Sequence, residues 1–371
     1  MRWLFWGAAA FIFFTYLGYP AWLWFCARWK SRPVPRAPVS PRISIVMAVH
    51  NEAAALRAKL VNLAAIDYPP ELVEIVVASD GSTDATNTIL QEWSGPRRKA
   101  IILKINQGKA STLNHATRAA EGDILVFTDV RQRIGPDAVR VLVESFADSS
   151  VGCVSGELML EGNDRGATSG GLGLYWGIEK MIRRWESDSG SVVGVTGALY
   201  AARKDLVPLL PPGTILDDVL IPLQAARGGK RVLFDGRARS YDRLADDRHE
   251  FRRKVRTLAG NYELLWLAPW LLTTRNAIRF RFVCHKLLRL LVPFALLGIL
   301  ISSLFLPGPF YRLVLAGEIL LCLGAILSAF PVRFGVISRL GSACSAFLVL
   351  NAAAMLAFVY FVTGRRVVWT R

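Results

Sequence analysis

The sequence has few of the residues and motifs that build common metal and cofactor sites. Its five cysteines are scattered along the chain, which argues against a disulfide framework, and they form no C-x-x-C pair. Its four histidines have no metal-ligand spacing, so a zinc site is not expected. No G-x-G-x-x-G follows the first apolar strand and no G-x-x-x-x-G-K-[ST] occurs, so neither dinucleotide nor P-loop chemistry is indicated.

Acidic residues are also scarce. The 371-residue chain has 29 Asp and Glu against 45 Lys and Arg, a net charge of +16, and 53% apolar side chains. The apolar content excludes disorder, and the long charged middle excludes a many-helix transporter. These values predict a chain that is part membrane and part globular. Nucleic acid is not expected as a partner, because contact with membrane lipids explains the positive charge sufficiently.

Long apolar runs predict the membrane spans. One arginine precedes the first run and five cations follow it, which predicts an external N-terminus and a cytoplasmic middle at the cytoplasmic (inner) membrane. Three arginines in the tail, at 365, 366 and 371, do not fit three further crossings, so a re-entrant segment and an exception to the rule both stay open. Glu318 within the third run is either functional or paired with a neighbouring helix. The four runs are Trp3–Phe25, Leu290–Leu306, Leu313–Val332 and Ala343–Val362.

A mixed segment precedes the second run. Residues Tyr262–Lys286 interleave apolar and basic side chains, which predicts an amphipathic segment on the membrane surface; a core helix of the soluble domain is the alternative. The predicted division of the chain is an anchor and basic linker (1–39), a cytoplasmic domain (40–261), the interfacial segment (262–289) and a C-terminal transmembrane region (290–371).

Short β-branched runs alternate with amphipathic runs of helical length between the first and second spans. This alternation predicts an α/β fold with a mostly parallel sheet flanked by helices, and ligands bind such sheets beyond the carboxyl ends of the strands. The predicted strands are Ile43–Val49, Val73–Ser79, Ala100–Lys104, Ile124–Thr128 and Val151–Ser155, and the predicted helices are Ala53–Leu63, Asp84–Gln91, Lys109–Ala119 and Asp137–Phe146.

Polar residues follow these strands. His50, Asn51 and Glu52 come after the first, Asp80 after the second and Asp129 after the fourth. A carboxylate at the end of an apolar strand is costly to desolvate unless it accepts hydrogen bonds or binds a cation. A nucleotide with a divalent ion supplies both, so we expect Asp80 and Asp129 to be functional, whereas Asp84 or Ser82 alone fits a helix cap.

An ordered run of matches resembles the membrane-anchored family 2 glycosyltransferases, which have the GT-A fold and are related to polysaccharide synthases and polyprenyl-phosphate sugar transferases. The resemblance covers about residues 43 to 260, with an N-terminal and about three C-terminal transmembrane helices around it. Its pieces are Ile43-Ser44-Ile45-Val46 leading to Asn51-Glu52, Asp67-Tyr68-Pro69, Glu74 to Asp84, Gly108-Lys109, Leu113-Asn114, Gly122-Asp123, Asp129 and Asp217-Asp218.

The resemblance implies a role for each matched position. Asp129 would bind Mg²⁺ or Mn²⁺, and Asp218 of the pair Asp217-Asp218 would be the general base. Arg256 would bind the pyrophosphate. The nucleotide-sugar donor would contact Asp80, which holds the base or ribose, and the residues His50, Asn51, Glu52, Lys109 and Asn114 around it.

Two departures from the family pattern bear on function. Arg131 replaces the second acid of the D-x-D element, which predicts weaker metal binding or a direct contact with phosphate. Arg256 lacks the Gln and Trp of the processive Gln-x-x-Arg-Trp motif, which favours single transfer. The expected activity is inverting transfer from a nucleotide diphosphate sugar, UDP-linked as the first choice, to a lipid-linked or membrane-presented glycan acceptor. A processive polysaccharide synthase and a catalytically silent scaffold subunit are the alternatives.

Overall fold

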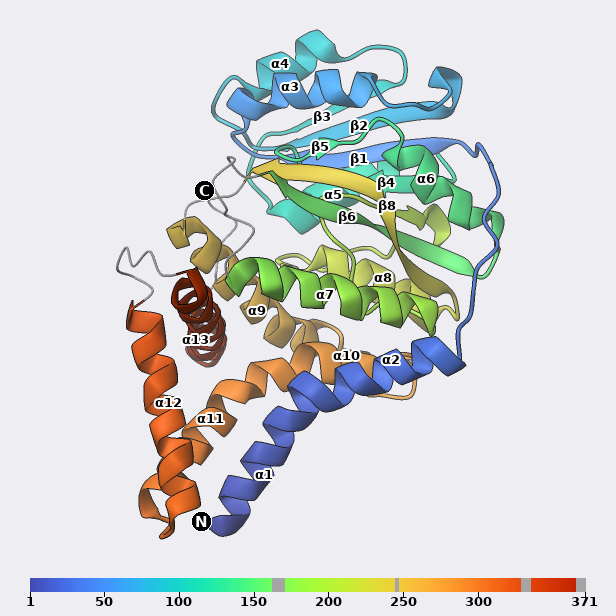
Figure 1. The fold of residues 1–371 in the computed structure, drawn as a ribbon. Coiled ribbons are helices and arrows are strands. Elements are labelled where there is room, and N and C mark those ends of the chain that lie inside the picture. The colour runs from blue at the N-terminus through green and yellow to red at the C-terminus, as the bar shows by residue number, and fades with distance from the viewer. Residues whose placement is uncertain (162–170, 244–246, 328–334, 365–371) are drawn as a thin grey trace.

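The computed structural model describes residues 1–161, 171–243, 247–327 and 335–364. Its centre is a sheet of eight strands in the order β3-β2-β1-β4-β7-β6-β8-β5 (Figure 1). The strands are β1 Ile43–Val49, β2 Val73–Asp80, β3 Arg98–Leu103, β4 Ile124–Phe127, β5 Arg133–Ile134, β6 Val151–Glu161, β7 Tyr200–Arg203 and β8 Arg231–Arg243.

The predicted mostly parallel α/β sheet is confirmed. Strands β3, β2, β1 and β4 run parallel, and every residue of β1 is buried, as the continuous apolar run of a doubly covered strand requires. The second half of the sheet is mixed, because β7 is antiparallel to both β4 and β6, and β5 is antiparallel to β8. The short β5 and β7 and the long β8 were not among the predicted strands.

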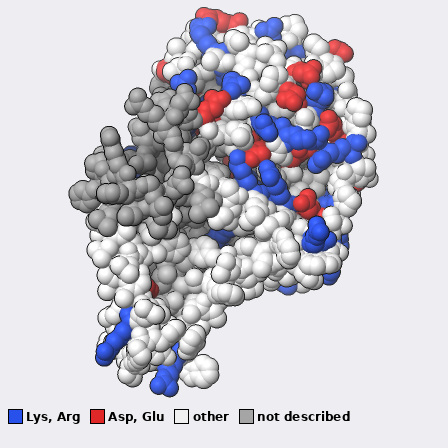
Figure 2. Space-filling model, in the orientation of Figure 1, with Lys and Arg blue, Asp and Glu red and all other residues white. Residues whose placement is uncertain are grey.

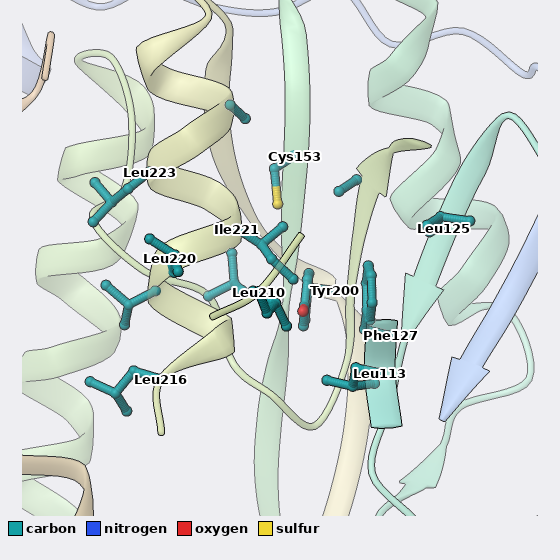
Figure 3. Close-up of a cluster of buried hydrophobic side chains, with 14 of the residues drawn as sticks. Leu113, Leu125, Phe127, Cys153, Tyr200, Leu210, Leu216, Leu220, Ile221 and Leu223 are labelled. Carbon is teal, nitrogen blue, oxygen red and sulfur yellow. The ribbon is translucent and has the colours of Figure 1, made fainter. Parts of the chain in front are cut away.

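Helices cover both faces of the sheet. Helices α3 (Ala53–Ala64), α4 (Thr86–Trp93) and α6 (Ala138–Glu144) contribute buried residues to one apolar cluster. Helices α5 (Lys109–Ala119) and α8 (Asp217–Arg227) contribute to the cluster on the opposite face. In that second cluster (Figure 3), Phe127 stacks on Tyr200 with ring centroids 4.7 Å apart. This packing fixes the start of α8, where Asp217 and Asp218 lie, against the end of β4.

Four helical segments are long and apolar enough to cross a membrane, as predicted. The end of the third predicted run, 328–332, and the tail arginines lie outside the described residues. Oxygen Oε2 of Glu318 is buried and has no hydrogen-bond partner in the described ranges, and both interpretations of this residue stay open. The first segment joins α1 (Arg2–Phe13), a π-turn (Phe14–Gly18) and α2 (Tyr19–Trp29); the second joins α10 (Arg279–Phe282), a π-turn (Val283–Leu287) and α11 (Leu288–Phe305); α12 (Pro309–Leu327) and α13 (Gly335–Val362) follow.

The charge distribution separates the two parts of the molecule. In the face shown in Figure 2, Lys, Arg, Asp and Glu gather over the sheet domain, and the helical part below it is nearly free of charge. Large apolar side chains are exposed on these helices, including Trp3 at 90% and Leu313 at 72%. Such surfaces are typical of helices that contact lipid, so the helices suggest anchoring in a membrane.

The segment 262–289 combines features of both predictions made for it. Helix α9 (Asp247–Leu267) crosses the predicted boundary, and a 3₁₀ turn (Pro269–Leu272) follows it. Leu264 and Leu271 are buried in the core of the sheet domain, as a core helix requires, whereas Trp266 is 81% exposed. The segment therefore packs on the domain and still exposes an aromatic side chain.

Candidate active site

A cavity of 390 Å³ lies beyond the carboxyl ends of the strands, within the size range of small-ligand sites. Its upper wall comes from the residues that follow β1 and β4, and its lower wall from α7 (Gly171–Asp188), α9, the π-turn before α11, and α13 (Figure 1). The predicted site residues that line it are His50, Glu52, Lys109, Asp129, Arg131, Asp217, Asp218 and Arg256.

Asn51, Asp80 and Asn114 are the predicted site residues outside this lining. Asp80 is fully buried, and its carboxylate accepts hydrogen bonds from the backbone N–H groups of Gln107 (2.7 Å) and Gly108 (2.9 Å). Asp80 thus holds the turn that precedes Lys109 at the start of α5. Its contact with a base or ribose stays a prediction.

The other two residues also hold loops. Asn51 has a left-handed backbone (φ 52°), which Asn tolerates better than most residues, and its side-chain oxygen accepts a hydrogen bond from the Thr83 N–H at 2.8 Å. Asn114 exchanges two hydrogen bonds with the backbone of Leu210, at 2.8 and 2.9 Å. Both side chains shape the edges of the site, and their contact with a donor stays a prediction.

Lys109 links two of the acidic residues. Its ammonium lies 3.1 Å from Oδ1 of Asp129 and 3.3 Å from Oδ1 of Asp217, and its side chain is only 16% exposed. Burial by itself lowers the pKa of Lys109, but the carboxylates of Asp129, Asp217 and Asp218 outweigh burial and raise it. Lys109 therefore stays charged and holds Asp129 and Asp217 in fixed positions.

Asp218 is placed to accept a proton. Burial and the neighbouring Asp217 carboxylate raise the pKa of Asp218 to about 6, and Lys109 and Lys286 act in the opposite direction. Gly197 lies beside it: a Cβ at that position would be in ordinary van der Waals contact with Oδ2 of Asp218 (3.5 Å) and with Oδ2 of Asp129 (3.7 Å). The two carboxylates thus border one small space. A carboxylate with this pKa is ionised at neutral pH and basic enough to work as a general base.

Arg131 and Arg256 supply positive charge from opposite sides of the cavity. Arg131 follows β4, and Arg256 lies on α9. Neither guanidinium makes a hydrogen bond or ion pair in the described part of the chain. Because an arginine is always charged, both are available to bind an anionic ligand.

Sequence reasoning missed Lys59. This buried lysine of α3 donates hydrogen bonds to Oγ1 of Thr128 (2.8 Å) and to the carbonyl of Gln132 (2.6 Å), the residues on either side of the Asp129–Arg131 turn. Burial lowers the pKa of Lys59 to about 7, against the raising effect of Asp129. The available signal was its position on the buried face of α3, which it shares with Leu56, Leu60 and Leu63.

The lower wall of the cavity was also missed. Helix α7 contributes Trp176, Glu179, Lys180 and Arg183, and the π-turn before α11 contributes Lys286. The alternation of charged and apolar residues in 171–188 was the available signal for an amphipathic helix. Nothing in that pattern tells which of its polar residues face a ligand.

The residues fit a divalent cation only together with a donor. The described residues contain no group of three His, Cys, Asp or Glu side chains that could hold a metal ion. Asp129 is 42% exposed and lines the cavity beside Gly197. Mg²⁺ is commonly bound by one or two carboxylates with substrate phosphates and water, so Asp129 suits such a site when a diphosphate is bound.

The sheet domain is similar to known proteins. Residues 44–207, from β1 to just after β7, match the model of the family described as glycosyl transferase family 2. This domain belongs to that family. The mannosyltransferase PcManGT from Pyrobaculum calidifontis, solved with GDP-Man and Mn²⁺, is 22% identical, with a TM-score of 0.75 over 98% of this chain and 99% of that one. The likeness shows the GT-A fold.

Two curated relatives are matched over a smaller share of their length than PcManGT is. A probable glycosyltransferase, YdaM, of Bacillus subtilis (strain 168) is 24% identical over 65% of this chain and 60% of its own length. Poly-beta-1,6-N-acetyl-D-glucosamine synthase of Staphylococcus epidermidis is 23% identical over 62% of this chain and 56% of its own length. The chain thus spans less than two thirds of these relatives.

Proposed function

We propose that the protein is an inverting glycosyltransferase that moves one sugar from a nucleotide diphosphate sugar to an acceptor presented by the membrane. The observation that carries the proposal is the pair of carboxylates, Asp129 and Asp218, which lie on either side of Gly197 in one cavity with Lys109. This arrangement offers a base for the acceptor and cations for the leaving group within a single site.

The leaving diphosphate needs positive charge. Its negative charge grows as the glycosidic bond breaks, so fixed cations near it stabilise the transition state. Arg131 and Arg256 make no hydrogen bond or ion pair with the described residues and line the same cavity, which suits them to bind the two phosphates. A divalent cation held by Asp129 would supply further charge neutralisation on the phosphate oxygens.

The acceptor hydroxyl must lose a proton as it attacks. Asp218 is ionised at neutral pH and can take that proton. Attack from the face opposite the leaving group needs this single base and inverts the anomeric centre. Asp217, which is bound to Lys109, orients the start of α8.

The donor and acceptor classes are inferred from a solved relative and from the apolar helices. UDP-sugars are the first choice, and GDP-mannose is included because PcManGT was solved with it. Four helices suited to a membrane favour a lipid-linked or membrane-presented glycan acceptor, with the sheet domain on the cytoplasmic side as the flanking charges predict. The missing Gln and Trp around Arg256 favour single transfer.

A donor panel tests the proposal. The full chain in native-like vesicles is incubated with labelled UDP-glucose, UDP-galactose, UDP-N-acetylglucosamine and GDP-mannose, with and without EDTA, and labelled product is sized on a gel. We expect one donor to give a product extended by a single sugar, and EDTA to reduce its rate. A long product would support the processive alternative, and no nucleotide release from any donor would support the scaffold alternative.

A further inference from the structure

Helix α7 forms part of the cavity wall and also packs on the first and second apolar segments. Its cavity-lining residues recur at helical spacing and are Trp176, Glu179, Lys180 and Arg183. From another side of the same helix, Ile182 packs in an apolar cluster with Tyr19 and Leu23 of α2 and with Cys284 of the π-turn before α11 (Figure 1). The position of the cavity wall therefore depends on how these two segments hold α7.

A buried histidine joins α7 to the second apolar segment. His285 lies in the π-turn Val283–Leu287 and is 2% exposed. Its Nδ1 lies 2.8 Å from Oε1 of Glu186, and its Nε2 lies 3.0 and 3.2 Å from the two carboxylate oxygens of Glu179. Both glutamates belong to α7 and are buried. The imidazole thus bridges two carboxylates that are about two helical turns apart.

The bridge requires a charged imidazole. A neutral imidazole has one N–H group, so its other nitrogen would present a lone pair to a carboxylate. The imidazolium donates from both nitrogens and is the form that pairs with both glutamates. Burial by itself raises the pKa of Glu179 and of Glu186, but His285 and the neighbouring arginines outweigh burial and lower both. Both carboxylates are therefore ionised, as the bridge requires.

Other polar side chains hold the same contact. Tyr19 of α2 donates a hydrogen bond to Oε1 of Glu186 at 2.7 Å, and Arg289 of α11 donates to Oε2 of Glu179 at 2.8 Å. Arg281 donates to backbone carbonyls just beyond the end of α7. Both apolar segments therefore hold α7 by polar contacts. The charged and titratable groups around the imidazole are Tyr19, Glu179, Arg183, Glu186, Arg281, Cys284, Lys286 and Arg289.

Stability is a poor explanation for a buried charge cluster. Replacing buried ion pairs by apolar residues is often neutral or stabilising, so such a cluster fits the fixing of one geometry better. The geometry includes the next residue, since Lys286 lines the cavity. A Cβ placed on Gly194 would be 3.8 Å from Cε of Lys286 and 3.6 Å from the carbonyl oxygen of Asp218. One π-turn, a feature frequent at functional sites, thus contacts both α7 and the first turn of α8.

We propose that His285, as an imidazolium, is a positioning residue for the transfer reaction. It holds α7 through Glu179 and Glu186, while the same π-turn places Lys286 near Asp218. The cavity wall and the base therefore keep their relative positions only while the apolar segments are docked on α7. This inference rests on the proposed function, because the reaction that His285 serves is the proposed sugar transfer.

Nitrogen-15 magnetic resonance of the full chain in lipid vesicles, with labelled histidine, tests the charge of His285. The chain has four histidines, and the signals that H285Q lacks are those of His285. We expect both of its ring nitrogens to carry protons at neutral pH. A neutral tautomer, with one unprotonated ring nitrogen, would overturn the inference.

Hydrogen exchange and kinetics test the positioning. H285Q cannot donate to both glutamates as the imidazolium does, so the amides of α7 should exchange faster while those of α3 stay as in the wild type. The kcat should fall roughly ten- to a hundredfold, because a small displacement of reacting groups costs about that factor, and the Kd of UDP or GDP should not change. H285K keeps a charged donor and should recover part of the kcat. The matched control H115Q changes a histidine of α5 outside the cavity lining and should behave as the wild type.

The outcomes separate the inference from the proposed function. If the wild type turns over no donor of the panel, the proposed function fails, whereas magnetic resonance and exchange still test the contact with α7. If a donor is turned over and H285Q has the kcat of the wild type, the inference is wrong and the proposed function stands. Faster exchange throughout H285Q would assign His285 a merely structural role and also overturn the inference.

A second variant covers the case in which H285Q does not fold, which loss of nucleotide binding would reveal. Y19F removes one hydrogen bond to Glu186 and leaves the imidazole in place. It should speed the exchange of α7 and lower the kcat a few-fold at an unchanged nucleotide Kd. A kcat equal to that of the wild type, with faster exchange of α7, would show that the position of α7 does not matter for the reaction.

Discussion

The two ends of the cavity balance their charges differently. At the sheet end, Lys109 neutralises Asp129 and Asp217 within one ion-paired cluster. At the other end, Arg256 and Lys286 make no direct hydrogen bond or ion pair with the described residues, although Glu263 acts on the first and Asp218 and Glu179 act on the second through longer-range charge. A balanced cluster keeps its geometry without a ligand, whereas cations without a direct hydrogen-bonded partner can gain one when an anionic substrate binds. The difference indicates a preformed catalytic centre next to a region completed by its substrates.

The largest expected effect comes from the base. D218N keeps the shape of the side chain but cannot accept the proton, so the turnover number should fall by about 10²–10⁴-fold. Single-turnover product formation measures this fall. Nucleotide affinity, measured on the same samples, should stay within error, because the sheet end of the cavity is intact. Turnover equal to that of the wild type would remove Asp218 from the mechanism.

Filling the space beside Gly197 should be the next most damaging change. G197V places methyl groups between Asp218 and Asp129 and displaces the reacting groups, at a cost of about a hundredfold in kcat. G197A is the matched control, because its Cβ makes only ordinary contacts at 3.5 and 3.7 Å. Steady-state kinetics compare the two, and equal rates for both variants would show that this space is not used.

Lys59 lies outside the cavity lining and holds the turn that carries Asp129. K59M removes both hydrogen bonds that hold the Asp129–Arg131 turn, which should reduce kcat roughly tenfold and raise the Mn²⁺ concentration needed for half-maximal activity. K59R should restore part of the lost kcat and part of the lost Mn²⁺ response. The control V61M changes a 71% exposed residue of the same helix. An unchanged Mn²⁺ requirement in K59M, with only thermal stability reduced, would assign Lys59 a structural role.

The smallest effect is the pH dependence. Burial and Asp217 raise the pKa of Asp218 to about 6, so the basic form is lost as the pH falls through that value. The kcat of the wild type should therefore fall to about half its plateau value near pH 6 and to about a tenth of the plateau value near pH 5. A flat profile down to pH 5 would be incompatible with this protonation state.

The parallel half of the fold and the acidic residues could be predicted from sequence. Strands β1 and β4 are mostly apolar and β2 contains the apolar run Ile75–Ala78, and such runs are recognisable without tertiary information. Strands β5 and β7 have only two and four residues, and their pairing depends on distant neighbours, so local pattern did not reveal them.

The role of individual polar residues was harder to predict. Asp80 and Asp129 both follow apolar strands, yet Asp80 binds backbone amides and Asp129 lines the cavity. Sequence does not give the direction of a side chain at a strand end. Lys286 was interpreted with the membrane-contacting cations for the same reason, because only the fold shows that it lies beside Asp218 rather than at a lipid headgroup.

The anomeric configuration of the product tests the central claim most directly. A single displacement with Asp218 as the sole base must convert an α-linked donor into a β-linked product. Nuclear magnetic resonance of the product made by the wild type, with the donor identified in the panel, measures the configuration at the new bond. We predict complete inversion; an α-linked product would contradict a single displacement with Asp218 as the base.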